Sequence, residues 1–262
     1  MVWMIGALGL GACVGSFVNV LIYRLPRERS VVSPGSHCFC CGTPLGARDL
    51  VPVFSYLLSG GHCRYCGAAL SGQYATVEAL CAVLYGALAW RWGPSLTFAV
   101  YAVAAAAMVA ACGTDLRLKI IPNSLNQAIG VAGFGGALLA LWLPAQRLPS
   151  PALSLLGAAV GWAVFESVVR FGRWWFGQEA MGGGDVLLAA AVGALLGPTR
   201  AFAAFFLVSI VAGAVIGLLL MAVARVHRRQ AIPFGPFLVA GALTVMLAPQ
   251  VGDWVAAIYH LG

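Results

Sequence analysis

The sequence contains little charge. Only 9% of its 262 residues are Asp, Glu, Lys or Arg, whereas 61% are hydrophobic, and a soluble domain carries about 25% charged residues. This composition excludes a soluble globular protein and predicts a polytopic protein embedded in a lipid bilayer. The net charge of +7 then reflects basic residues that flank membrane helices. Because no basic patch is interleaved with aromatic residues, no nucleic-acid partner is expected.

Motifs of several enzyme classes are also missing. The sequence has no Gly-x-Ser-x-Gly of a serine hydrolase, no His-Glu-x-x-His of a zinc protease and no Gly-x-Gly-x-x-Gly nucleotide loop. The four histidines, at positions 37, 62, 227 and 260, lie in predicted loops or at the C-terminus. Carboxylates therefore remain as the candidates for catalysis, and the chain has only eight of them.

Apolar runs of roughly 20 residues, enough to cross a bilayer, follow one another along most of the chain. They predict an all-α polytopic membrane protein with about eight transmembrane helices. Three regions are expected: a first transmembrane helix in residues 1–23, a cysteine-rich insert in 24–73, and a seven-helix membrane domain in 74–262. The predicted spans are residues 2–23, 74–92, 95–113, 124–143, 150–170, 183–198, 201–224 and 234–259.

Lysine and arginine are distributed unevenly between the two sides of this predicted bundle. Twelve of the fifteen lie on the side of the insert, which predicts that the insert faces the cytoplasm and that both termini lie outside. The same topology places Asp115 and Asp185 on the cytoplasmic face, at the ends of the third and sixth spans. The twelve are Arg24, Arg27, Arg29, Arg48, Arg64, Arg117, Lys119, Arg170, Arg173, Arg225, Arg228 and Arg229.

Asp115 and Asp185 are the acids most suggestive of function, because an ionisable side chain at the edge of an apolar span is costly to desolvate. Asp115 follows Gly113-Thr114, and Asp185 follows the glycines at 182–184. Glycines before an acid let another backbone approach the carboxylate closely. Two structural interpretations stay open. Asp115 could pair with Arg117 or Lys119, and Asp185 could be a helix N-cap.

The pair suits peptide hydrolysis by water. Two adjacent carboxylates cannot both ionise easily, so one keeps a proton. The ionised aspartate takes a proton from the attacking water, while the protonated one polarises the scissile carbonyl and later protonates the leaving amine. Which of Asp115 and Asp185 is the base stays open, because such a pair titrates as a unit.

The insert holds a pair of Cys-x-x-Cys motifs, Cys38 with Cys41 and Cys63 with Cys66. Two such knuckles can bring four thiolates to one tetrahedral zinc ion. Gly42 and Gly67, directly after the motifs, suit turns that aim backbone N–H groups at sulfur. We expect a structural zinc that supplies folding energy to a region too small for its own core.

Other arrangements of the insert's cysteines remain possible. A disulfide or free thiols are the alternatives to zinc, although disulfides are rare on a cytoplasmic face. His37 or His62 could replace a cysteine ligand, and Cys40 is supernumerary. Four thiolates would close the metal site, so catalysis by this metal is not expected.

Several further motifs occur in a recognisable order along the chain. In this context the chain resembles the bifunctional type IV prepilin peptidases/N-methyltransferases, which also process type II secretion pseudopilins. Asp115 with Ile121-Pro122, and Asp185 in its glycine run, correspond to the two catalytic aspartates of that family. The other matching segments are Gly15-Ser16-Phe17-Val18-Asn19-Val20 with Arg24-Leu25-Pro26, the two cysteine knuckles, Asp49 to Tyr56, and Ile232-Pro233-Phe234-Gly235-Pro236.

The resemblance implies two activities in a bacterial inner membrane. The protein would cut a short basic leader from a prepilin or pseudopilin after a glycine, at the cytoplasmic face. It would then methylate the new N-terminal amine with S-adenosylmethionine. Asn19, Arg24 and Glu78 are candidates for the methyl-donor site, although Arg24 also fits a positive-inside anchor and Glu78 a structural ion pair. The expected partners are the substrate helix and the lipid bilayer.

The chain departs from the family pattern at three positions. Leu187 stands where a lysine is usual, Ala75 replaces a proline, and Asn123 replaces a common aspartate. The closest alternative function is a peptidase without methyl transfer. A presenilin-like protease that cuts within the bilayer and a non-enzymatic membrane scaffold with a zinc ribbon are the others.

Overall fold

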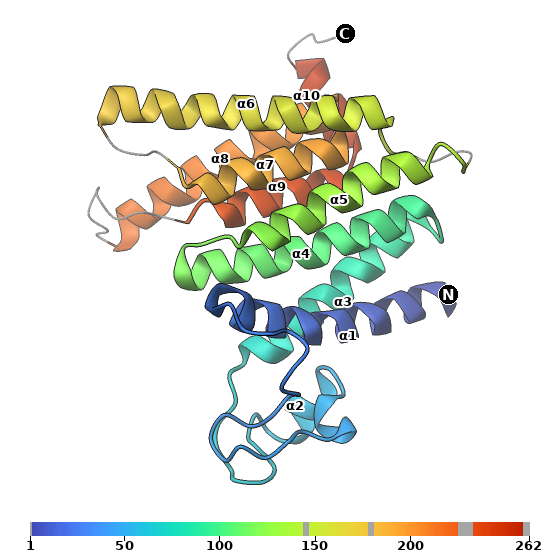
Figure 1. Ribbon diagram of the computed structural model, residues 1–262, viewed down its shortest axis with the longest axis vertical. Helices are drawn as coiled ribbons and strands as arrows, with labels where there is room; N and C mark the ends of the chain where they lie inside the picture. The colour runs from blue at the N-terminus through green and yellow to red at the C-terminus, as the bar shows by residue number, and fades with distance from the viewer. Residues whose placement is uncertain (1, 144–146, 178–180, 225–232, 259–262) are drawn as a thin grey trace. The chain divides into compact units, whose positions relative to one another are not determined.

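The computed structural model describes residues 2–143, 147–177, 181–224 and 233–258. Helices account for all the regular secondary structure in these ranges, apart from two isolated β-bridges in the cysteine-rich insert. The chain forms two compact units, residues 1–94 and residues 95–262. Figure 1 gives the order of the helices. The all-α prediction is therefore confirmed.

The first unit is built on a close pair of helices, α1 (Val2–Arg24) and α3 (Gln73–Trp92). Two glycines of α1 make the close approach possible, because a Cβ on Gly11 would lie 2.5 Å from the carbonyl oxygen of Cys81, and one on Gly15 would lie 2.7 Å from Cα of Glu78. Small residues at such a crossing are typical of helices that pack in membranes. Asn19 joins the two helices by donating to the carbonyl of Tyr74 at 3.1 Å.

The insert between these helices has little regular structure. It contains the short 3₁₀ helices η1 (Leu25–Arg27) and η2 (Ala47–Leu50) and one α-helical turn, α2 (Phe54–Leu58). Asp49 links η2 to the second cysteine knuckle, since its carboxylate accepts from the Tyr65 hydroxyl at 3.0 Å and pairs with Arg64 at 3.1 Å. Such polar links and the cysteines take the place of a large apolar core.

The second unit surrounds one short helix. α7 (Gly183–Leu196) is apolar and mostly buried, and it contacts α5, α6, α8 and α9 (Figure 1). α6 comes closest, because a Cβ on Gly157 would overlap the Gly193 carbonyl. The other helices of this unit are α4 (Leu96–Leu118), α5 (Asn123–Leu139), α6 (Pro151–Phe176), α8 (Arg200–Ala224), α9 (Gly235–Leu247) and α10 (Gln250–Ile258).

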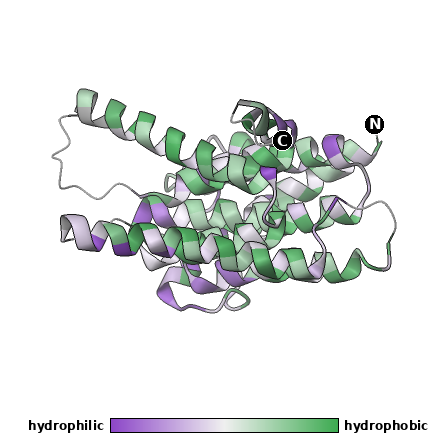
Figure 2. Ribbon diagram, turned by 90° about the horizontal axis from the view of Figure 1, so that it is seen from above, coloured by the Kyte–Doolittle hydropathy of each residue, from purple (hydrophilic) through white to green (hydrophobic). Residues whose placement is uncertain are grey.

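Each of the eight predicted spans contains a helix, but eight membrane crossings are not confirmed. The last span, residues 234–259, is divided between α9 and α10, and its residue 259 lies outside the described residues. Among the described residues, only α1, α4, α6 and α8 are long and apolar enough to cross alone, and α9 with α10 forms a possible fifth span that is bent by 101°. In Figure 2 the helices are coloured green, for hydrophobic residues, over most of their length. At a rise of about 1.5 Å per residue, the 14 residues of α7 reach only about 21 Å, short of a bilayer core of about 30 Å.

Two further predicted spans are too short or too polar to be counted among these membrane-crossing helices. α5 has 17 residues and opens with the polar run Asn123 to Gln127, and α3 carries Glu78 and Arg91. The apolar runs thus predicted the helices correctly, while the number of membrane crossings stays a prediction. The division of the chain after residues 23 and 73 stays a prediction.

Candidate active site and metal centre

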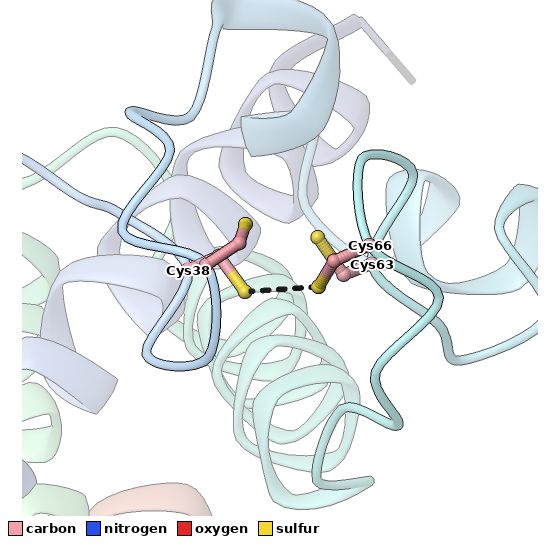
Figure 3. A group of neighbouring side chains, drawn as sticks. Cys38, Cys63 and Cys66 are labelled. Atoms are coloured by element: carbon pink, nitrogen blue, oxygen red, sulfur yellow. Dashed lines mark hydrogen bonds between the residues drawn. The ribbon is translucent and has the colours of Figure 1, made fainter.

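The four cysteines of the two knuckles meet in the insert. The sulfur atoms of Cys38, Cys41, Cys63 and Cys66 all lie within 4.8 Å of one another. Figure 3 shows Cys38, from the first knuckle, facing Cys63 and Cys66 of the second. The arrangement gathers four potential metal ligands from two sequence segments, as their spacing predicted.

The two knuckles repeat one backbone design. The N–H of Gly42 donates to Cys38 O at 2.9 Å, and the N–H of Gly67 donates to Cys63 O at 2.8 Å. Both glycines have a positive φ, 71° and 73°, which only glycine adopts at little cost. Each knuckle also has an antiparallel bridge, His37 with Pro44 and His62 with Ala69. The repeat includes the predicted Cys-x-x-Cys motifs with their following glycines, and a leading histidine completes it as His-Cys-x-x-Cys-Gly in both segments.

The sulfur cluster fits a tetrahedral metal ion. Four sulfurs around one zinc ion, with Zn–S bonds of about 2.3 Å, lie about 3.8 Å apart, and the Cys38 and Cys66 sulfurs are 3.9 Å apart. The Thr43 side chain and backbone lower the pKa of the Cys41 thiol to about 6 by hydrogen bonding. Backbone hydrogen bonds from Tyr65 and Cys66 also lower the pKa of Cys63. Both effects favour the thiolate form that binds metal.

The other possible ligands of the insert lie outside the cluster. Among the described residues, the ligand group around these sulfurs consists of the four cysteines. His37 and His62 instead have Nδ1 within hydrogen-bond distance of the carbonyls of Gly35 and Gly60. Cys40 is exposed. The geometry thus favours four sulfur ligands over a mixed set.

Asp115 lies in the last turn of α4 and is only 5% exposed. Its Oδ2 accepts a hydrogen bond from the backbone N–H of Gly235, the first residue of α9, at 2.9 Å. The free N–H groups at a helix N-terminus carry partial positive charge, so this end of α9 favours a carboxylate beside it. Helix α4 ends just beyond Asp115, where Lys119 adopts a left-handed conformation.

Asp185 lies in the first turn of α7 and is 8% exposed. Its Oδ2 accepts from the N–H of Gly182 at 3.3 Å. Gly182 itself is the N-cap, so Asp185 helps to cap the helix from its third position and is not the N-cap residue. Its other oxygen, Oδ1, is buried and has no hydrogen-bond partner. One oxygen therefore stabilises the helix start, and the other remains for chemistry.

Ile121 connects the surroundings of the two aspartates. A Cβ on Gly184 would lie 3.1 Å from Cβ of Ile121, and a Cβ on Gly235 would lie 3.0 Å from its Cδ1. The two carboxylates are close enough for their charges to interact. Gly184, which precedes Asp185, and Gly235, which binds Asp115, therefore both pack against Ile121. The catalytic role of the two aspartates stays a prediction at this point.

Two residues of this site were not singled out from the sequence. The N–H of Gly235 contacts Asp115, and Asn126 of α5 donates from Nδ2 to the carbonyl of Gly184 at 3.1 Å. A polar amide within an apolar helix is the signal for Asn126. The contact with Gly235 had no local signal, because 120 residues separate it from Asp115.

The three candidates for the methyl-donor site all lie in the first unit and have local partners. Asn19 donates to Tyr74 O and accepts from Gln73. Arg24 donates to the carbonyls of Ser30 and Pro34, at 3.0 and 2.7 Å. Their assignment to the methyl donor stays a prediction.

Glu78 holds an unusual turn. Its Oε2 accepts from the N–H of Val53 at 2.7 Å. Val53 has φ 65° and ψ −51°, and the N–H of Phe54 bonds to Pro52 O at 2.7 Å. These features define a γ-turn of the strained kind, which is rare for a β-branched residue. Glu78 therefore has a structural role, and its part in methyl-donor binding stays a prediction.

The structure also shows the surroundings of Glu166 and of Leu187. Glu166 and Arg170, four residues apart on α6, form an ion pair at 2.9 Å. Leu187, in the place of the family's usual lysine, is 41% exposed on the first turns of α7. The missing lysine therefore does not leave a buried gap beside Asp185.

These features define a class: a multi-pass helical membrane protein that combines a four-cysteine insert with two aspartates buried at the ends of helices. The model of the bacterial peptidase A24 N-terminal domain matches residues 10–92, and that of the type IV leader peptidase family matches residues 102–218. The chain belongs to the type IV leader peptidase family.

Curated relatives extend this similarity over most of the chain. A protein of Bacillus subtilis is 32% identical over 95% of this chain and 94% of its own length. One of Xanthomonas campestris is 35% identical over 88% and 86%, and one of Myxococcus xanthus is 36% identical over 81% and 61%. All three are named prepilin leader peptidase/N-methyltransferase. No solved structure matches the chain.

Proposed function

We propose that this protein is an aspartic endopeptidase that removes the leader peptide from prepilins or pseudopilins and then methylates the new N-terminal amine. Its family and the names of its relatives support both activities. The observation that carries the peptidase half is the burial of Asp115 and Asp185 at the ends of α4 and α7, with Ile121 packed against the glycines that adjoin or bind them.

Hydrolysis by this pair needs one proton shared between two carboxyl groups. The ionised aspartate takes a proton from water as the water oxygen bonds to the scissile carbonyl carbon. The protonated aspartate donates a hydrogen bond to the carbonyl oxygen. Collapse of the tetrahedral intermediate then breaks the C–N bond, and the leaving amine receives a proton from the pair. The hydrogen bonds from Gly235 and Gly182 hold one oxygen of each carboxylate in place.

The proposed active site faces the cytoplasm of a bacterial inner membrane. The bias of twelve in fifteen basic residues toward one side supports this orientation. A prepilin would present its basic leader at this face, while its apolar segment stays in the bilayer as a helix. The ends of α4 and α7 are then suitably placed to cut at the membrane boundary.

The four cysteines would hold a structural zinc ion. Cys38, Cys41, Cys63 and Cys66 supply a complete tetrahedral set, which leaves no open position for substrate. A bound ion would supply folding energy to an insert that has no large apolar core. Its proposed role is thus to fix the insert between α1 and α3.

The methyl transfer would use S-adenosylmethionine, which supplies an activated methyl group when bound. The proposed donor site lies in the first unit, with Asn19, Arg24 and Glu78 as its candidate residues. These side chains make hydrogen bonds with atoms of the first unit itself. No step of the methyl transfer is therefore assigned to them, and this half of the proposal rests on the family.

Purified full-length protein, a prepilin peptide and S-adenosylmethionine test the proposal, with mass spectrometry of the products. The expected products are a free leader and a mature peptide that carries one added methyl group. A mature peptide without a methyl group would indicate a peptidase alone. Intact substrate under all conditions would contradict the proposal and favour a scaffold.

A further inference from the structure

Asn126 supports the turn that carries Asp185. It lies near the start of α5, is 5% exposed, and donates from Nδ2 to the carbonyl of Gly184 at 3.1 Å. Gly184 directly precedes Asp185, so the amide holds the peptide unit adjoining the aspartate. On its other side Gly184 packs against Ile121. The turn is therefore held in place both by Asn126 of α5 and by Ile121.

The orientation of this amide leaves one atom without a partner. A carbonyl oxygen can only accept, so the Asn126 atom that faces Gly184 must be the nitrogen. The Asn126 Oδ1 is then a buried acceptor, and no described residue donates to it. A buried acceptor without a donor is costly. In native proteins such atoms usually have an ordered water or a ligand as partner.

A second buried acceptor lies on the same turn, in Asp185, the residue that follows Gly184. Asp185 Oδ1 also has no hydrogen-bond partner. Among the described residues, Asp185 Oδ1 and Asn126 Oδ1 are the two buried side-chain nitrogen or oxygen atoms that have no hydrogen-bond partner. The bond from Asn126 to Gly184 connects their surroundings directly. A molecule with two O–H donors satisfies two acceptors at once, and an enclosed water needs two to four polar partners.

We infer that Asn126 is a further active-site residue, whose Oδ1 accepts a hydrogen bond from the attacking water while Asp185 Oδ1 accepts the other. This inference rests on the proposed peptidase function and names the residue that orients its nucleophile. With both hydrogens directed to these acceptors, a lone pair of the water oxygen is free to form the bond to the scissile carbonyl carbon. A proton passes from the water to the carboxylate pair, and Asn126 stays neutral throughout.

Ser154 offers a matched control. It is fully buried in α6 and donates from Oγ to the carbonyl of Ala194 at 2.7 Å. Asn126 and Ser154 thus each tie a neighbouring helix to a main-chain carbonyl at one end of α7, but only Asn126 does so beside Asp185. A Ser154→Ala variant measures how much kcat and the melting temperature fall when a hydrogen bond between α7 and a neighbouring helix is lost away from Asp185.

The test compares Asn126→Leu, Asn126→Asp and Ser154→Ala with the parent protein, each full-length in lipid nanodiscs. Initial rates of prepilin peptide cleavage give kcat and KM, and thermal melting reports the fold. Asn126→Leu is expected to lower kcat roughly ten- to a hundred-fold with KM unchanged, the range for one or two lost hydrogen bonds. Ser154→Ala is expected to keep kcat within about twofold, even if its melting temperature falls.

Asn126→Asp preserves the shape of the side chain and places a third carboxyl beside Asp115 and Asp185. Interacting carboxyls share their protons, so the pH of maximal kcat is expected to move in this variant and to stay unchanged in Ser154→Ala. Three results would overturn the inference: an unchanged kcat in Asn126→Leu, a rise in KM alone, which points to a substrate N–H, or an equal loss in Ser154→Ala. A parent protein that fails to cleave would contradict the proposed function instead.

Discussion

The carboxylate of Asp115 accepts a hydrogen bond from the backbone N–H of Gly235, 120 residues further along the chain, at 2.9 Å. This contact fixes the C-terminal end of α4 against the N-terminal end of α9. It also explains the glycine, because a Cβ at position 235 would lie only 2.6 Å from Asp115 Oδ2.

Gly235→Ala is therefore expected to impair cleavage severely. The added methyl group must displace the Asp115 carboxylate, and a displacement of about 1 Å in a catalytic group can cost about a hundred-fold in rate. The measurement is kcat for prepilin cleavage. Gly135→Ala is the control, since a Cβ there meets no atom within 4 Å. Equal activity of the two variants would show that the contact with Gly235 does not position Asp115.

The glycines before Asp185 are expected to differ in their tolerance of alanine. A Cβ on Gly184 would lie 3.1 Å from Cβ of Ile121, whereas one on Gly183 meets no atom within 4 Å. Gly184→Ala should lower the cleavage rate by about tenfold by shifting the turn, and Gly183→Ala should leave it almost unchanged. The reverse order of effects would contradict the packing of Ile121 against this turn.

The cysteine insert is expected to lose its metal when one ligand is removed. Cys63→Ser should lower the zinc content, measured by atomic absorption, and the melting temperature, because metal binding contributes to folding. Cys40→Ser is the matched control, since Cys40 lies outside the cluster. Unchanged zinc content in Cys63→Ser would rule out the four-thiolate site.

Acid should release the metal, because protons compete with zinc for thiolates. The pKa of Cys41 is lowered from 9.0 to about 6 in the folded insert. A group with a lowered pKa in the folded state stabilises the fold fully above its unfolded value and loses this effect as the pH falls through its folded value. Zinc content should therefore be retained at neutral pH and fall in acid, at a pH below the pKa of the metal-free Cys41 thiol, because bound zinc competes with protons for the sulfur. Zinc retention by Cys41→Ser down to the same pH as the parent protein would contradict thiolate ligation by Cys41.

Glu78 is expected to stabilise the strained turn at Val53. Glu78→Leu leaves the Val53 N–H without its acceptor, which should cost about 1–3 kcal/mol of unfolding free energy. Glu78→Gln keeps an acceptor oxygen and should lose less. Urea unfolding of the purified protein provides the comparison. If both variants lose the same stability, the hydrogen bond to Val53 is not what Glu78 contributes.

The local features of the sequence predicted the helices and the cysteine cluster well. Apolar runs mark helices directly, and the Cys-x-x-Cys-Gly segments contain the turn and its ligands within a few residues. The number of membrane crossings was harder to predict, because hydrophobicity alone does not separate a buried helix such as α7 from one that faces lipid.

The long-range parts of the site could not be read from the sequence. Asp115 and Asp185 were identified because acids are rare in apolar spans. Gly235 and Asn126 matter through contacts with residues far from them in the sequence. Neither the amide of Asn126 nor the family-like segment around Gly235 indicates which residue it contacts. The pairing of α4 with α9, and of α5 with the start of α7, decides their roles.

The most direct test of the central claim is the cleavage rate of Asp115→Asn and Asp185→Asn beside a matched acid variant, Glu166→Gln. Glu166 lies on a membrane helix and forms an exposed ion pair with Arg170, so its loss should leave cleavage unchanged. Asparagine keeps the shape of aspartate but can neither accept the proton from water nor donate one to the leaving amine. We expect both Asp variants to keep the melting temperature of the parent and to lose cleavage completely. Substantial cleavage by either variant would contradict the two-aspartate mechanism.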